Sequence, residues 1–135
     1  MAAPPARARA HLVRDRKELV SIKISRHCYA ITGLGFLPPW SVNAGFIAGE
    51  VVTLVVDTGA TTQAARTIYG YASSARSNDR VLAINTEHHL DHIGGNSLFR
   101  DLGCDIYGHP QIARVEDELD FALDRQEKIR YAKYA

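Results

Sequence analysis

The stretch Thr86–Asn96, TEHHLDHIGGN, gathers three histidines, an aspartate and a glutamate just before two glycines. It directly follows Val81–Asn85, VLAIN, a short apolar run that predicts a strand buried on both faces. In α/β proteins, ligands commonly bind in the loops just past the carboxyl ends of such strands. A solvated polar turn is the alternative, and five ligand-type side chains among the six residues 87–92 argue against it.

The spacing inside this stretch suggests how the side chains are shared between ions. Glu87, His89 and Asp91 stand at alternate positions, and His92 follows directly. In an extended loop alternate side chains point the same way, so Glu87 and His89 are expected to converge on one ion. Asp91 and His92 diverge in such a loop and would reach a second point nearby. Imidazole and carboxylate together suit zinc, iron or manganese.

Toward the N-terminus the pattern is that of strands and tight connections. The alternating or apolar runs that predict strands are Leu19–Ser25, His27–Thr32, Ser41–Ala48 and Val51–Asp57. The last two are joined by Gly-Glu and read as a hairpin. The Gly- and Pro-rich run Gly33–Trp40 predicts a loop.

Helices are predicted on both sides of the histidine-rich stretch. One begins near Gln63 with Thr61 or Thr62 as its cap, and a short one runs from Asn96 to Leu102 and is stopped by Gly103. The run Cys104–His109 predicts another strand. Pro110 opens a long helix with an apolar stripe made by Ile112, Val115, Leu119, Ala122 and Ile129. This alternation predicts an α/β fold with a mixed, partly parallel sheet and flanking helices.

The composition is that of one soluble domain. A chain of 135 residues with 46% hydrophobic side chains can bury one core, and we expect a disordered tail over residues 1–15 followed by one domain over 16–135. The net charge of +1 argues against nucleic acid and anionic membranes as partners. No run approaches the roughly 18–20 apolar residues of a membrane span. Cys28 and Cys104 are expected to be buried free thiols, and without a secretory signal we expect a cytoplasmic protein.

A family resemblance rests on three stretches taken together. TEHHLDHIGGN resembles the metal-binding motif of the metallo-β-lactamase superfamily, His-x-His-x-Asp-His followed by Gly-Gly. The run NAGFIAGEVVTLVVDTGA is similar to the hairpin before that motif, and it ends in the family's Asp-Thr-Gly turn at Asp57. DIYGHP is similar to the strand after the motif, which often ends in a histidine, here His109. The match covers about residues 41–110 in the family's order.

The resemblance implies an αββα sandwich, of which this chain would supply the N-terminal half, and a metal-dependent hydrolase. One or two zinc ions, or iron or manganese, would activate a water that attacks a small-molecule ester, thioester, amide or phosphoester. By position, His89 would bind the first metal, and Asp91 and His92 the second. Asp91 is also the candidate catalytic residue. Asp57 would shape the site without binding metal; its alternative role is a turn or cap carboxylate. His109 is expected to support the structure.

The chain departs from the family pattern in two ways. Glu87 stands where the first histidine should be, and His88 takes the variable position; an oxygen ligand there shifts preference from zinc toward iron or manganese, or weakens the first site. The remaining ligands of the family come from the second half of the sandwich, which follows the part matched here.

Three hypotheses follow from these departures. The sequence is the N-terminal part of a longer hydrolase, or a half-domain that forms a homo-oligomer through its exposed sheet. The third is a non-catalytic module that binds one ion or none.

Overall fold

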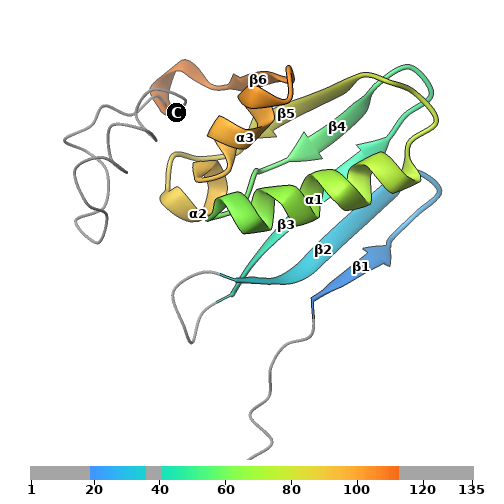
Figure 1. Cartoon of the computed structure of the whole chain (residues 1–135), viewed down its shortest axis with the longest axis horizontal. Coiled ribbons are helices and arrows are strands. Elements are labelled where there is room, and N and C mark those ends of the chain that lie inside the picture. The colour runs from blue at the N-terminus through green and yellow to red at the C-terminus, as the bar shows by residue number, and fades with distance from the viewer. Residues whose placement is uncertain (1–18, 36–40, 113–135) are drawn as a thin grey trace, which may run out of the picture.

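The computed structural model describes residues 19–35 and 41–112. They form one six-stranded sheet whose strands lie side by side in chain order (Figure 1). The strands are β1 (Val20–Lys23), β2 (Cys28–Gly35), β3 (Ser41–Ala48), β4 (Thr53–Val56), β5 (Val81–Asn85) and β6 (Asp105–Gly108). The helices are α1 (Thr62–Ala75), α2 (Leu90–Ile93) and α3 (Asn96–Asp101), and a 3-10 turn, η1, spans Pro110–Ile112.

The sheet is mixed, as the alternation of patterns predicts. The pairs β1–β2, β2–β3 and β3–β4 are antiparallel, whereas β4–β5 and β5–β6 are parallel. Parallel neighbours need a crossover connection, and here the crossovers are α1 and the pair α2–α3. The parallel strands therefore end at the same edge of the sheet, with α2 beside it (Figure 1).

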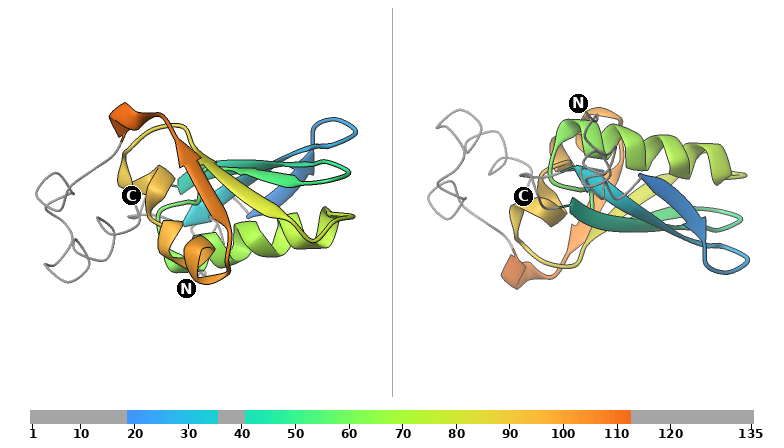
Figure 2. Two further views of the ribbon diagram at one scale, coloured as in Figure 1. Left: turned by 90° about the horizontal axis from the view of Figure 1, so that it is seen from above. Right: turned by 90° about the horizontal axis from the view of Figure 1, so that it is seen from below.

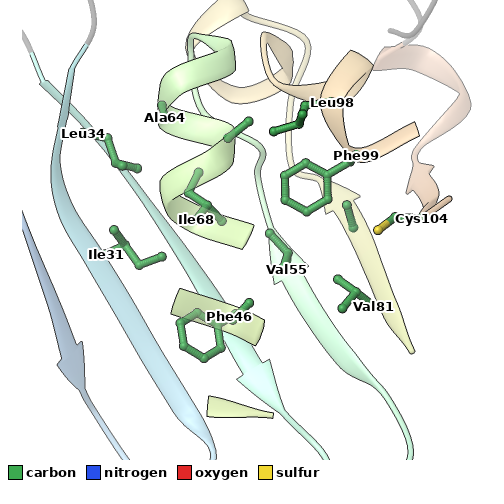
Figure 3. Close-up of a cluster of buried hydrophobic side chains, with 13 residues drawn as sticks. Ile31, Leu34, Phe46, Val55, Ala64, Ile68, Val81, Leu98, Phe99 and Cys104 are labelled. Atoms are coloured by element: carbon green, nitrogen blue, oxygen red, sulfur yellow. The ribbon is translucent and has the colours of Figure 1, made fainter. Parts of the chain in front are cut away.

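The helices α1 and α3 cover one face of the sheet (Figure 2). Phe46, Val55 and Ala83 are register neighbours on that face, and each is at most 2% exposed. They meet Ile68 of α1 and Phe99 of α3 in one core (Figure 3). This layer of helices over a mixed sheet agrees with the predicted α/β fold class.

The helix α1 forms where the sequence predicts it. The side chain of Thr61 accepts a hydrogen bond from the backbone N–H of Ala64 at 3.1 Å, which satisfies one of the free donors of the first turn. The buried positions Ala64, Ala65, Ile68 and Ala72 recur at helical spacing. Small side chains at these positions let the helix lie close to the strands.

The opposite face of the sheet carries no helix among the described residues, and two predictions change as a result. Ile84 is 37% exposed, so the prediction that Val81–Asn85 is buried on both faces was wrong. Cys28, on that same face, is only partly buried, and both cysteines are free. The buried thiol is Cys104, 7% exposed.

The predicted loop over Gly33–Trp40 was wrong at its start, because β2 continues to Gly35. The register with β3 shifts between Ile31 and Leu34, as at a β-bulge. Gly33 has a φ of 77°, which only glycine adopts without strain. This glycine therefore marks the bulge and not the end of the strand.

The predicted N-terminal tail and most of the predicted C-terminal helix lie outside the described residues. So do the rest of the predicted loop, residues 36–40, and the stripe residues after Ile112. None of the helices in ranges 19–35 and 41–112 is long and apolar enough to cross a membrane.

Candidate metal site

The site lies at the edge where β4 and β5 end. Asp57 follows β4, and Thr86 follows β5. The helix α2 begins four residues later and brings Asp91 and His92 to the same edge. This is the position at which open α/β sheets usually bind their ligands.

Asp57 has an unusual backbone that is fixed by its neighbours. Its φ is 62°, a left-handed conformation that aspartate tolerates better than most residues. Its backbone N–H donates to the carbonyl of Ile84 at 2.9 Å, and the residue is 6% exposed. The conformation directs a buried carboxylate toward the end of β5.

The Asp57 carboxylate accepts hydrogen bonds from both sides of the histidine-rich stretch. The N–H of Thr86 donates to Oδ1 at 2.8 Å, and the Thr86 hydroxyl donates to Oδ2 at 2.8 Å. Nδ1 of His92 lies 2.8 Å from Oδ2. Because a carboxylate can only accept, Nδ1 of His92 carries the proton in this contact, and in the neutral imidazole Nε2 keeps its lone pair.

The Nε2 side of His92 faces two carboxylates. Oε1 of Glu87 lies 3.1 Å from Nε2, and Oδ2 of Asp91 lies 3.5 Å from it. The other oxygen of Glu87 contacts Nδ1 of His89 directly. Glu87 therefore links the two imidazoles, and the four predicted ligands meet in one chain of contacts.

The charges at the site shift two pKa values. The hydrogen bond from His89 lowers the pKa of Glu87, and its partial desolvation opposes this less strongly. Burial by itself lowers the pKa of His92, but the hydrogen bond to Asp57 and the charges of Asp57, Asp91 and Glu87 together outweigh it, so the pKa of His92 is raised. The carboxylates of Asp57, Glu87 and Asp91 make the site electronegative, and His92 is its most strongly held imidazole.

The predicted divergence of Asp91 and His92 was wrong, because the stretch is not extended there. Leu90–Ile93 forms the short helix α2, whose backbone N–H groups at His92 and Ile93 bond the carbonyl of His89 at 2.9 and 3.2 Å. The side chains of Asp91 and His92 leave this short helix in different directions. Their ends nevertheless meet, with Oδ2 of Asp91 3.5 Å from Nε2 of His92. The alternation rule holds for Glu87 and His89, which do converge.

The donor types around His92 fit a metal ion. Ligands that bind one ion tetrahedrally at about 2.0–2.1 Å lie roughly 3.3 Å from each other. The separations of Nε2 from Glu87 and Asp91, 3.1 and 3.5 Å, fall on either side of that value. In the described part of the chain, however, no group of three or more His, Cys, Asp or Glu side chains is arranged so that it could hold a metal ion. The side chains around His92 would therefore have to move to bind one.

His109 lies beyond β6, the strand next to β5, and is exposed. Its Nδ1 accepts a hydrogen bond from the N–H of Gln111 at 3.2 Å, and its carbonyl accepts from Ile112 at 3.0 Å. These bonds start the turn η1, and the structural role predicted for His109 stays a prediction.

Sequence reasoning missed the polar residues that hold the site. Thr86 binds Asp57, and Thr58, Asn85 and Asn96 form a buried network beneath α2. Asn85 is the last residue of β5 and Asn96 the first of α3, so polar residues at buried element ends were the available signal.

The fold resembles that of solved metallo-β-lactamases. A metallo-β-lactamase from Hirschia baltica superposes with a TM-score of 0.63 at 22% identity, over 71% of this chain and 45% of that one. DIM-1 metallo-β-lactamase gives a TM-score of 0.62 at 18% identity, and so does FIM-1 from Pseudomonas aeruginosa; each alignment covers 71% of this chain and 44% of the other. The chain thus spans less than half the length of these structures.

Comparison with curated proteins finds no match. The sequence model of the metallo-beta-lactamase superfamily, however, matches residues 37–129, more than half of the chain, and this range contains both the Asp57 turn and the histidine-rich stretch. The same range contains the strands and helices that place those residues together. Since the family model matches more than half of the chain and the solved structures share its fold, the chain belongs to the metallo-beta-lactamase superfamily.

Proposed function

We propose that the site at the end of β5 binds metal and supports hydrolysis of a small-molecule ester, thioester, amide or phosphoester. The observation that carries the proposal is the placement of the two ring nitrogens of His92. Asp57 holds its Nδ1 at 2.8 Å, while its Nε2 lies within 3.5 Å of two carboxylates. An imidazole oriented by a carboxylate behind it is the usual form of a metal-binding histidine.

The ligands would be Glu87, His89, Asp91 and His92. When bound, the metal supplies a Lewis acid that lowers the pKa of a water to about 7. His92 offers Nε2 because Asp57 keeps the proton on Nδ1. Glu87 and Asp91 supply negative charge and oxygen donors, and the contact of Glu87 with His89 is the one that ion binding would replace.

Asp91 is the proposed catalytic residue. Its carboxylate is 31% exposed, so it is open to substrate and water. It lies at the first turn of α2, 3.5 Å from Nε2 of His92. From there it can accept a hydrogen bond from the attacking water and hold it in one orientation.

Zinc is the proposed metal, as one or two ions, and Glu87 makes iron or manganese the alternative. Carboxylate is a harder ligand than imidazole, and manganese and iron accept oxygen donors readily. The proposed preference therefore depends on one side chain, which makes it easy to test.

The experiment is elemental analysis of metal in the purified chain, followed by a hydrolysis screen with one chromogenic substrate from each class. Loss of both metal and hydrolysis in Asp91→Asn, with retention in Asp79→Asn, would support the proposal. Asp79 is a suitable control because it lies before β5, at the opposite end of that strand from the site. Metal well below one equivalent, with no hydrolysis, would contradict it.

We also propose that the open face of the sheet is covered by a second copy of this chain. Two rows of register neighbours cross that face: Cys28, Ile47, Leu54 and Leu82, and Ala30, Gly45, Val56, Ile84 and Tyr107. Ile47, Ile84 and Tyr107 are 41%, 37% and 54% exposed. These side chains carry no charge, and the first row ends at the exposed Asp105 of β6. Apart from that edge of the sheet, two such faces can meet without electrostatic repulsion.

Sedimentation of the purified chain tests this association. A dimer that Ile84→Lys dissociates, and that Val51→Lys does not, would support it. Val51 is 78% exposed outside the two rows, so its variant adds the same charge elsewhere. A wild-type chain that sediments only as a compact monomer would contradict it, and would leave the face to another segment of a longer polypeptide.

A further inference from the structure

A reciprocal amide pair lies beneath the site. Nδ2 of Asn96 donates to Oδ1 of Asn85 at 2.8 Å, and Nδ2 of Asn85 donates to Oδ1 of Asn96 at 3.1 Å. Asn85 is 7% exposed and Asn96 is 1% exposed, so water does not compete for these bonds. The pair ties the end of β5 to the start of α3, on the two sides of the histidine-rich stretch.

Thr58 joins this pair to the end of β4. Its hydroxyl is fully buried and donates to Oδ1 of Asn96 at 2.8 Å, with His92 O as a second acceptor at 3.2 Å. The carbonyl of His92 is thereby surrounded by three donors: the Thr58 N–H at 2.9 Å, the Thr58 hydroxyl, and Nδ2 of Asn85 at 3.5 Å. The backbone of His92 is held from both strand ends.

The same two strand ends hold the ring of His92. Asp57 and Thr86 contact its Nδ1 side, at 2.8 and 3.5 Å, and these residues are the chain neighbours of Thr58 and Asn85. Thr58 and Asn85 therefore fix the carbonyl of His92. Their chain neighbours Asp57 and Thr86 fix its imidazole. With both ends of one residue anchored, the direction of Nε2 is determined.

We propose that Asn85, Asn96 and Thr58 are positioning residues that set the direction of the His92 imidazole. None of them reaches the Nε2 side, so they act through His92 and not on a substrate. The inference rests on the proposed function only in taking Nε2 as a metal ligand. The orientation of the ring itself does not depend on that assignment.

A purely structural role for the pair predicts a different result. Buried amides are costly when one partner is removed, but replacing both by apolar groups of similar size is nearly neutral for stability. A network kept for packing alone could be exchanged for two leucines without consequence at the site. A network that orients His92 could not be exchanged in this way. The carbonyl of His92 would lose its donor Asn85, and the hydroxyl of Thr58 would lose its acceptor Asn96.

The experiment compares Asn96→Leu, the double variant Asn85→Leu/Asn96→Leu, and Ser97→Ala. The hydroxyl of Ser97 is buried in the same helix and has no hydrogen-bond partner among the described residues, so Ser97→Ala is a matched control. Zinc affinity is measured by competition with a chromophoric chelator, and the ring nitrogens of His92 are followed by NMR in metal-free protein.

We expect the double variant to unfold closer to wild type than Asn96→Leu does, yet to bind zinc roughly ten- to a hundredfold more weakly, as for other residues that orient ligands. The His92 ring signals should move in both Asn variants and stay in place in Ser97→Ala. A folded double variant with zinc affinity within about twofold of wild type and unmoved ring signals would overturn the proposal.

Two further outcomes are decided by the same design. Where the asparagine variants do not fold, Thr58→Val replaces them, because valine keeps the shape and the backbone N–H but removes the hydroxyl bonds to Asn96 and His92. Unmoved ring signals in that variant would overturn the proposal. If the wild-type chain binds no zinc, the proposed function fails, and movement of the His92 signals still supports the positioning role.

Discussion

Nδ1 of His92 lies 2.8 Å from Oδ2 of Asp57, although 35 positions separate the two residues in the chain. The contact joins the end of β4 to α2, and it leaves Nε2 as the ring nitrogen that faces Glu87 and Asp91. Asp57 reaches it from a backbone with a φ of 62°, so a slightly strained residue supports the candidate ligand.

Replacement of Asp57 by Asn should weaken zinc binding about tenfold, because the side chain that contacts Nδ1 of His92 loses its charge and no longer favours the proton there. Asparagine tolerates a positive φ, so the backbone should keep its conformation. Chelator competition measures the affinity. Asp79→Asn is the control, and equal zinc affinity in the two variants would contradict the role of Asp57.

Replacement of Glu87 by His restores the family pattern and removes the carboxylate that links His89 to His92. The ratio of zinc to manganese affinity should rise, because imidazole is a softer donor than carboxylate. Glu50→His, on the exposed connection between β3 and β4, adds the same side chain away from the site. An unchanged ratio in Glu87→His would show that Glu87 does not select the metal.

Replacement of Gly95 by Ala should destabilise the fold by about 3 kcal/mol, as overpacking of a tight contact does. A Cβ there would overlap the carbonyl oxygen of Thr58 and lie 2.5 Å from Cβ of Ala65, between the motif and α1. Urea unfolding measures the change. Gly70→Ala is the matched control, since a Cβ at Gly70 meets nothing within 4 Å.

The control substitution Gly70→Ala should raise the stability by about 1 kcal/mol. Gly70 lies on the exposed side of α1, in the middle of the helix, and alanine is the better helix former. Similar effects of the two substitutions would mean that the close approach at Gly95 does not constrain the motif.

The Cys104 thiol should make stability depend on pH in the alkaline range. Burial raises its pKa above the ordinary value of 9.0, and Asp105 adds to this while Arg76 opposes it. The unfolded thiol ionises first, so the contribution is complete below pH 9.0 and is lost as the pH rises through the higher folded pKa. The difference in unfolding free energy between wild type and Cys104→Ala should therefore narrow above pH 9.0.

Thiol labelling gives an independent check on the two cysteines. A disulfide reagent should modify the partly buried Cys28 quickly and Cys104 only as the protein opens. Cys28→Ser should retain only the slow phase. Fast labelling of that variant would show that Cys104 is accessible.

The sequence alone predicted the elements whose signals are local. Val81–Asn85 is apolar and bounded by turn residues, Thr61 caps α1, and the run at Ser41–Ala48 meets its hairpin partner as expected. The same local logic placed Glu87, His89, Asp91 and His92 at one edge of the sheet. It failed at Gly33, where a glycine marks a bulge, and at Leu90–Ile93, where one helical turn interrupts the extended stretch.

Only the tertiary structure decided what holds the site and what covers the sheet. The bonds of His92 to Asp57 and Thr58, and the pair Asn85–Asn96, join residues that are distant in sequence or separated by the motif itself. The exposure of Ile84 likewise depends on which face the helices cover. Periodicity reports how a segment divides its own side chains between two faces. Which buried polar groups satisfy each other depends on how strand ends far apart in the chain are brought together.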